Sequence, residues 1–122
     1  MRCVIVDDND QFLDVARRLL ERGGLAVVGT ASTSADALRS VRDLRPDVTV
    51  VDVHLGEESG FDLAELLRRG AEGAESAVIL TSATPEQEFI ERVEASPALG
   101  FVRKSSLSAQ AIHRLLDPAT AG

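Results

Sequence analysis

The segment VTVVDVHLG, residues 48–56, begins with a short run rich in β-branched apolar residues that leads to Asp52. A run without regular polar alternation is typical of a strand buried on both faces of a sheet. Five such runs occur along the chain: Cys3–Val6, Ala26–Val28, Val48–Val53, Ala77–Leu80 and Gly100–Val102. We therefore expect five strands in the interior of the molecule.

Amphipathic helical segments follow each of these runs. Their expected apolar stripes are Phe12, Val15, Ala16, Leu19 and Leu20 before Gly23-Gly24; Ala37, Leu38, Val41 and Leu44 before Pro46; Leu63, Ala64, Leu66 and Leu67, ending near Gly70; Phe89, Ile90 and Val93; and about Leu107 through Ala111, Ile112 and Leu115 before Asp117-Pro118. The sequence Thr84-Pro85-Glu86-Gln87 predicts the start of the fourth helix, with an N-cap hydroxyl and a capping-box glutamine. The alternation predicts an α/β fold, with a five-stranded parallel sheet and helices on both of its faces.

The composition limits the class of protein. The 122 residues, 44% hydrophobic and 27% charged, are typical of one globular domain. A net charge of −7 argues against a basic face that holds nucleic acid. The single cysteine, Cys3, fits a core position and a reducing compartment, and no apolar run approaches the length of a membrane span. We expect a cytoplasmic protein that binds neither membranes nor, through this domain, nucleic acid.

Polar side chains gather where the expected strands end. Asp7 and Asp8 follow the first strand, Asp52 the third, Ser82 the fourth and Lys104 the fifth. Open α/β sheets bind ligands at the carboxyl ends of their strands, so these side chains are expected to share one site.

Three aspartates in one site require a counter-charge. Two unit charges ~4 Å apart repel by about 4 kcal/mol at an effective dielectric constant of ~20, and Lys104 alone does not balance three carboxylates. Oxygen ligands without cysteine or paired histidines favour Mg²⁺ over Zn²⁺. Aspartate is also a nucleophile toward phosphoryl groups, and Asp52 is the best placed of the three for that role.

With these positions the chain resembles the receiver domain of bacterial two-component response regulators, from Arg2 to about Leu116. The resemblance rests on Asp7-Asp8, Asp52, Gly60, Ser82 followed by Ala83, Phe101 and Lys104. It implies a three-layer, flavodoxin-like (βα)5 fold. It also implies a module that catalyses only its own phosphorylation and dephosphorylation, rather than an ordinary enzyme.

The resemblance implies a role for each matched residue. Asp52 would accept a phosphoryl group from a phosphohistidine on a sensor histidine kinase or phosphotransfer protein. Mg²⁺ would be held by Asp7, Asp8, Asp52 and the main-chain carbonyl of His54. Lys104 and Ser82 would contact phosphoryl oxygens, and movement of Ser82 would let Phe101 turn inward and change the surface of the fourth helix, fifth strand and fifth helix. His54 and Thr84 lie where side chains tune dephosphorylation, although a loop histidine and a helix-capping threonine need no such role.

The chain departs from the family pattern at three positions. Ser105 follows the lysine where the family often has proline, and Gly56 replaces a proline common in the loop after Asp52. We expect Gly56 to loosen that loop. Phe101 stands where tyrosine is frequent, so it has no hydroxyl to donate in a switched state.

Two alternative functions stay open from the sequence. A phosphatase with an aspartyl nucleophile would usually carry a second acid two residues after the first, where this chain has His54. A receiver-like interaction module that is not phosphorylated is the other alternative, and Mg²⁺ binding would discriminate against it. The remaining phenylalanines, Phe12, Phe61 and Phe89, are expected to pack in the core or at its rim, and His113 to be solvated.

The expected domain organisation is a receiver domain over residues 1–117. Residues 118–122 are expected to be a flexible tail or the start of a linker. Receivers of this kind often precede a DNA-binding output domain, which suggests control of transcription or of a partner. A phosphorylation-dependent homodimer through the fourth and fifth helices is a further expectation.

Overall fold

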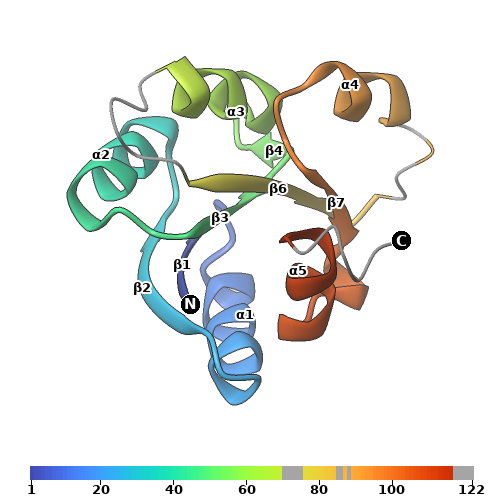
Figure 1. Ribbon diagram of the computed structural model, residues 1–122. Helices are drawn as coiled ribbons and strands as arrows, with labels where there is room; N and C mark the ends of the chain where they lie inside the picture. Colours follow the sequence, from blue (N-terminus) through green and yellow to red (C-terminus); the bar gives the residue numbers. More distant parts are fainter. Residues whose placement is uncertain (70–75, 85–86, 88, 117–122) are drawn as a thin grey trace.

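A computed structural model describes residues 1–69, 76–84, 87 and 89–116 (Figure 1). Its central sheet has five parallel strands in the order β2-β1-β3-β6-β7. These strands are β1 (Arg2–Val6), β2 (Ala26–Ala31), β3 (Val48–Asp52), β6 (Ala77–Ser82) and β7 (Gly100–Arg103). The helices are α1 (Asp10–Arg22), α2 (Ser34–Leu44), α3 (Gly60–Arg69), α4 (Ile90–Ala95) and α5 (Ala109–Leu116), with a short 3₁₀ turn η2 (Lys104–Ser106). The predicted α/β class and parallel sheet are confirmed, and the strand order is that of flavodoxin-like folds.

The helices cover both faces of the sheet, as Figure 1 shows. Helices α1 and α5 pack on one face around Ile5, Val50 and Ile79. Helices α2, α3 and α4 pack on the other face around Val51 and Leu80. Because successive strand residues point to opposite faces, each central strand supplies both cores, which explains why its sequence is a continuous apolar run.

The apolar face of α1 is narrower than its sequence suggests. The structure buries Leu13, Ala16 and Leu20, which are spaced i, i+3, i+7 along the helix. Val15 and Leu19, predicted to be buried, are 58% and 39% exposed. Only a narrow row of α1 side chains contacts the sheet. The prediction that Val15 and Leu19 are buried was therefore wrong.

The described helix α4 begins later than the sequence predicts, and three of the five residues between Thr84 and Ile90 lie outside the described residues. Helix α4 begins at Ile90, and its N-cap residue Phe89 makes no side-chain cap hydrogen bond. Thr84, the predicted N-cap, instead donates its backbone N–H to Ser82 Oγ at 3.0 Å. Such a local serine turn competes with helix initiation. Pro85 and Glu86 of the predicted capping box lie outside the described residues, as do Gly70, Asp117-Pro118 and the predicted tail.

A small antiparallel hairpin, absent from the sequence prediction, follows β3. It consists of β4 (His54–Leu55) and β5 (Glu58–Ser59). Gly56 occupies the first position of its two-residue turn with φ +60°, a conformation that favours glycine. The Glu58 carboxylate accepts a hydrogen bond from the Ser34 N–H at 3.0 Å, which ties the hairpin to the start of α2. The replacement of proline by Gly56 thus permits a defined turn.

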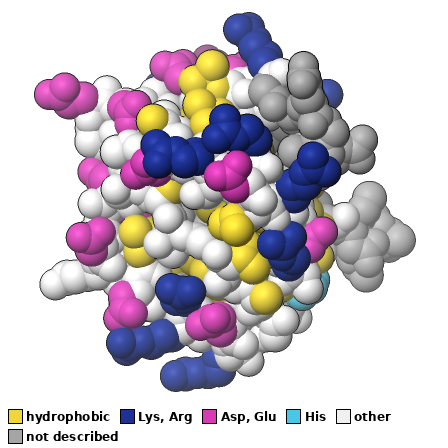
Figure 2. Space-filling view, turned by 90° about the vertical axis from the view of Figure 1, so that its left-hand side faces the viewer, with side chains coloured by type: hydrophobic (Ala, Val, Ile, Leu, Met, Phe, Trp, Pro, Cys, Tyr) yellow, Lys and Arg dark blue, Asp and Glu magenta, His cyan; other side chains and the backbone are white. Residues whose placement is uncertain are grey.

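On the face where α2 and β2 lie, basic and acidic side chains are intermixed, with hydrophobic side chains between them (Figure 2). On α2, for example, exposed Arg39 forms an ion pair with Asp36 at 3.4 Å. In the described ranges, no helix combines the length and the apolar character needed to cross a membrane.

Candidate functional site

The three aspartates meet at the carboxyl ends of β1 and β3, which are neighbours in the sheet. Asp7 follows the last residue of β1, and Asp52 is the last residue of β3. One carboxylate oxygen from each of Asp7, Asp8 and Asp52 lies within 4.8 Å of the others. Asp7 and Asp52 are buried, whereas Asp8 is exposed, so negative charge is concentrated at a place that opens to solvent on one side.

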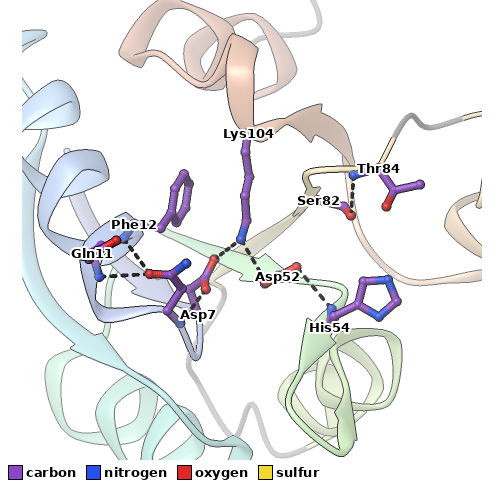
Figure 3. A network of polar contacts seen from close by, with 9 residues as sticks. Asp7, Gln11, Phe12, Asp52, His54, Ser82, Thr84 and Lys104 are labelled. Atoms are coloured by element: carbon purple, nitrogen blue, oxygen red, sulfur yellow. Dashed lines mark hydrogen bonds and ion pairs between the residues drawn. The ribbon is translucent and has the colours of Figure 1, made fainter.

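Lys104 supplies the nearest positive charge. Its Nζ forms an ion pair with Asp7 Oδ2 at 2.7 Å and donates a hydrogen bond to Asp52 Oδ2 at 3.1 Å (Figure 3). The lysine stands at the start of the turn η2, directly after β7, so its side chain reaches the acids across the strand ends. One ammonium against three carboxylates leaves the site with an excess of negative charge.

Burial and neighbouring charges shift two pKa values in this site. Burial raises the pKa of Asp52, and the charge of Asp7 raises it further, while the His54 N–H and Lys104 act in the opposite direction. For Lys104, burial lowers the pKa, but the contacts with Asp7 and Asp52 outweigh burial, so the net change is upward. The protonated ammonium is therefore strongly favoured, and the ionised form of Asp52 is disfavoured when no other cation is present.

The second oxygen of each buried acid is held by the chain next to it. Asp7 Oδ1 accepts the N–H of Asn9 at 2.8 Å, and Asp52 Oδ1 accepts the N–H of His54 at 3.1 Å. Asn9 in turn caps α1, and its Oδ1 accepts the N–H groups of Gln11 and Phe12 at 3.0 and 3.1 Å. The cap of α1 is therefore Asn9, which leaves the carboxylates of Asp7 and Asp8 available for another role.

These acids form a set that fits a hard divalent cation. Asp7 Oδ2 is buried, and its close charged contact is the Lys104 Nζ at 2.7 Å. All three groups are carboxylates, which are the ligands that Mg²⁺ prefers. The turn of the β4–β5 hairpin lies beside them, because a Cβ placed on Gly56 would be 3.7 Å from Asp8 Oδ2.

Ser82 lies on β6, the strand next to the acidic cluster, and Phe101 lies on β7, one strand further from it. Ser82 is the last residue of β6, the strand next to β3, and it is 1% exposed. Its Oγ accepts the Thr84 N–H, so its hydroxyl proton is free to be donated elsewhere. Phe101 on β7 is partly buried, and its ring centroid lies 6.3 Å from that of Phe89.

His54 and Thr84 occupy the rim of the site. The His54 ring meets the Phe89 ring edge-on, with centroids 5.6 Å apart, and points away from the acids (Figure 3). Thr84 is partly buried and contacts Ser82 through its backbone. The expected packing roles of Phe61 and Phe89 agree with their place in the core and against it, and His113 is exposed as expected.

One residue that contacts the site was not expected from the sequence. The Lys104 Nζ lies 4.4 Å from the ring centroid of Phe12, in the first turn of α1. The sequence offered one signal for this contact, because Phe12 comes four residues after Asp8 and shares the stripe of α1 that begins at the strand end.

Comparisons with known proteins agree with this geometry. The family model for the response regulator receiver domain matches residues 3–117. The signal receiver domain of the response regulator NarL from Mycobacterium tuberculosis has a TM-score of 0.82 at 29% identity, covering 99% of this chain and 97% of that one. Response regulator GacA of Pseudomonas viridiflava is 28% identical over 116 residues, which is 94% of this chain and 53% of that protein.

A protein-glutamate methylesterase/protein-glutamine glutaminase of Hahella chejuensis is 32% identical over 84 residues, 69% of this chain and 23% of that protein. This chain therefore spans about half, or less, of the length of these curated relatives. The chain belongs to the response regulator receiver domain family of two-component systems.

Proposed function

We propose that Asp52 accepts a phosphoryl group from a phosphohistidine on a sensor histidine kinase or a phosphotransfer protein. The observation that carries this proposal is the buried Asp52 carboxylate, hydrogen-bonded to Lys104 at 3.1 Å and grouped with Asp7 and Asp8. In the transfer, an Asp52 oxygen forms a bond to phosphorus while the bond from phosphorus to the histidine nitrogen breaks. The histidine leaves as imidazole, and Asp52 becomes an acyl phosphate.

Mg²⁺ is the proposed cofactor, with Asp7, Asp8, Asp52 and the main-chain carbonyl of His54 as its protein ligands. When bound, the ion supplies positive charge that stabilises the developing negative charge on the transferring group. Support comes from the excess of negative charge in the site and from the buried Asp7 Oδ2, whose close charged contact is one ammonium, the Lys104 Nζ at 2.7 Å.

Lys104 and Ser82 are proposed to bind the phosphoryl oxygens. Lys104 already contacts Asp52 Oδ2, so its ammonium lies close to the atom where the phosphoryl group would be attached. Ser82 would donate its hydroxyl proton to a second oxygen, since that proton is not needed for the bond with the Thr84 N–H. Side chains at His54 and Thr84 would tune the rate of dephosphorylation from the rim.

A change at Ser82 is proposed to pass to the surface formed by α4, β7 and α5. Ser82 and Arg103 are register partners on β6 and β7, which places Phe101 on the adjacent strand. Movement of Ser82 toward the phosphoryl group would let the partly buried Phe101 turn inward. The surface would thus have two conformations, and the negative charge of the phosphoryl group would favour one of them.

The switched surface is proposed to control an output domain or a partner protein. The GacA relative is named a response regulator and the Hahella chejuensis relative a methylesterase, so receivers of this kind occur with different outputs. We propose two consequences of the switch. One is control of transcription through a DNA-binding domain, and the other is a phosphorylation-dependent homodimer. Phosphorylation in the absence of a kinase is the step to test first.

The test is intact mass after incubation with acetyl phosphate, with and without Mg²⁺. We expect one phosphoryl adduct that requires Mg²⁺ and is absent from Asp52→Asn. Asp62→Asn, which alters an exposed aspartate of α3, is the matched control and should be labelled like the wild type. Full labelling of Asp52→Asn, or no adduct on any variant, would overturn the proposal, and steady release of phosphate in excess of the protein would favour a phosphatase.

A further inference from the structure

We propose that Phe12 is a positioning residue that keeps the Lys104 ammonium at the phosphoacceptor site, an inference that rests on the proposed function of Asp52. The Lys104 Nζ lies over the Phe12 ring, 4.4 Å from its centroid (Figure 3). A cation within about 6 Å of a ring centroid is attracted by the negative face of the ring. The ring therefore supplies a third contact to the ammonium, besides Asp7 and Asp52.

The contact is one of four interactions that connect Asp7, Asn9, Phe12 and Lys104 in a ring. Asp7 Oδ1 accepts the Asn9 N–H at 2.8 Å, and Asn9 Oδ1 accepts the Phe12 N–H at 3.1 Å. The Phe12 ring then meets the Lys104 Nζ, which returns to Asp7 through Oδ2 at 2.7 Å. Because the first turn of α1 is fixed to Asp7 through its cap, the ring is held at a defined place relative to the acids.

The ring differs from the other two contacts in one respect that matters for function. Asp7 and Asp52 attract Lys104 by their charge. A bound metal would compensate that charge, and phosphorylation would move it from the Asp52 carboxylate to the phosphoryl oxygens. Phe12 is neutral, so its attraction for the ammonium is the same before and after those events. Lysine has a long flexible stem with a strongly hydrated end, and without the ring its alternative is the solvent on the open side of the site.

The sequence makes this placement directly measurable, because Lys104 is the only lysine in the chain. Labelling the protein with ¹³C-lysine gives one Lys Cε–Hε signal in an NMR spectrum. Protons above an aromatic face are shifted upfield, so the Hε signal of the unphosphorylated wild type should lie upfield of free lysine. We expect this displacement to be lost in Phe12→Leu and retained in Phe12→Tyr, which keeps the ring.

The functional consequence is measured with acetyl phosphate, so that docking to a kinase plays no part. Phe12→Leu and Phe12→Met should be labelled about two- to fivefold more slowly than the wild type, as expected for loss of one cation–π contact. Phe12→Tyr should restore the rate. In a Lys104→Met background, Phe12→Leu should cause no further loss, because Phe12 acts through the lysine.

Two controls separate positioning from folding. Thermal melts show whether each variant is folded, and Phe12→Met serves if Phe12→Leu is not. Val15→Ala, an exposed residue of the same helix, should change neither the NMR signal nor the labelling rate. An unshifted wild-type Hε signal, or equal rates for the Leu and Tyr variants, would overturn the role of Phe12. Absence of labelling in the wild type would instead overturn the function of Asp52, and the NMR signal would still decide where Lys104 lies.

Discussion

Asp52, the proposed phosphoacceptor, occupies a position that should cost the folded protein stability. It is buried, lies close to Asp7 and Asp8, and has its pKa raised chiefly by burial despite hydrogen bonds from His54 and Lys104. A raised pKa means that the folded protein disfavours the ionised carboxylate relative to the unfolded chain. In the absence of a metal, the charge on Asp52 should therefore lower the free energy of unfolding at neutral pH.

This argument predicts that Asp52→Asn is more stable than the wild type in EDTA at neutral pH. The penalty in the wild type is absent below the ordinary aspartate pKa of about 4 and grows as the pH rises through the raised folded-state value. The stability gain of the variant should accordingly shrink as the pH falls toward 4. Thermal melts followed by circular dichroism measure it.

Asp14→Asn is the control for this pH dependence, because Asp14 is an exposed partner of Arg18. Exposed pairs contribute little, so its melting temperature should follow that of the wild type at every pH. A metal-free Asp52→Asn protein that melts below the wild type at neutral pH would contradict the prediction.

Thr81 provides a second prediction about a single side chain. Its hydroxyl is buried and has no hydrogen-bond partner among the described residues. Because an unpaired buried hydroxyl carries a desolvation penalty, Thr81→Val should raise the free energy of unfolding by about 1 kcal/mol. Urea unfolding measures the change.

A matched control for Thr81 exists in the same sheet. Thr49 is equally buried, but its Oγ1 is 2.9 Å from Ser76 Oγ. Thr49→Val should therefore lower stability, since it leaves the serine without that partner. Changes of the same sign at both positions would show that hydrogen bonding is not what distinguishes them.

At the scale of elements, the close approach of α3 to β3 depends on Gly60. A Cβ placed on this first residue of α3 would collide with the carbonyl oxygen and carbon of Asp52 and with Val53 Cα. Backbone cannot move aside cheaply, so Gly60→Ala should lower the free energy of unfolding by about 1–3 kcal/mol. It should also slow labelling by acetyl phosphate, because Asp52 itself is displaced.

Gly24→Ala is the comparison for this prediction. A Cβ on Gly24 would meet nothing within 4 Å, but its φ of +98° disfavours alanine. We expect a cost of about 1 kcal/mol from the backbone alone and no change in labelling rate. Loss of labelling in both variants would show that general destabilisation, and not the contact with Asp52, is responsible.

The sequence predicted the elements whose pattern reflects burial. The central strands β1, β3 and β6 were predicted because they are buried on both faces, and α2 because Ala37 and Val41 face the core. The edge strands β2 and β7 are partly exposed, and their short apolar runs were sufficient to predict them. Helix α4 begins later than predicted, and the Ser82 hydroxyl accepts the Thr84 N–H that a capping box would have used. The β4–β5 hairpin was missed because two-residue strands leave no periodicity to read, although Gly56 marked its turn.

At the scale of the whole molecule, topology explains how much of the site could be predicted. Asp7 and Asp52 meet because parallel strands place their carboxyl ends at one edge, and that rule needs only the strand assignments. The contact of Phe12 with Lys104 depends on the rotation of α1 and on the path of a long side chain. The spacing of Phe12 from Asp8 places it near the strand end but determines neither of these, so Phe12 was assigned to packing alone.

The same topology makes the stability of the whole molecule depend on the proposed metal site. A ligand that binds only the folded state stabilises it by mass action, by about 2.7 kcal/mol at a concentration 100 times its dissociation constant. The three carboxylates exist as a cluster only when β1 and β3 are paired. We therefore predict that Mg²⁺ raises the melting temperature in a concentration-dependent manner, whereas matched ionic strength from NaCl does not.

A substitution of Asp8 tests whether Mg²⁺ stabilises the protein through the aspartate cluster. It is the exposed member of the cluster and makes no ion pair within the described part of the chain, so Asp8→Asn should fold normally. In EDTA its stability should equal or exceed that of the wild type, because one repulsive charge has been removed. The increase in melting temperature caused by Mg²⁺ should be largely lost in this variant and unchanged in Asp14→Asn. If Asp8→Asn and Asp14→Asn responded equally to Mg²⁺, the ion would be acting on the net charge of −7 rather than at the aspartate cluster.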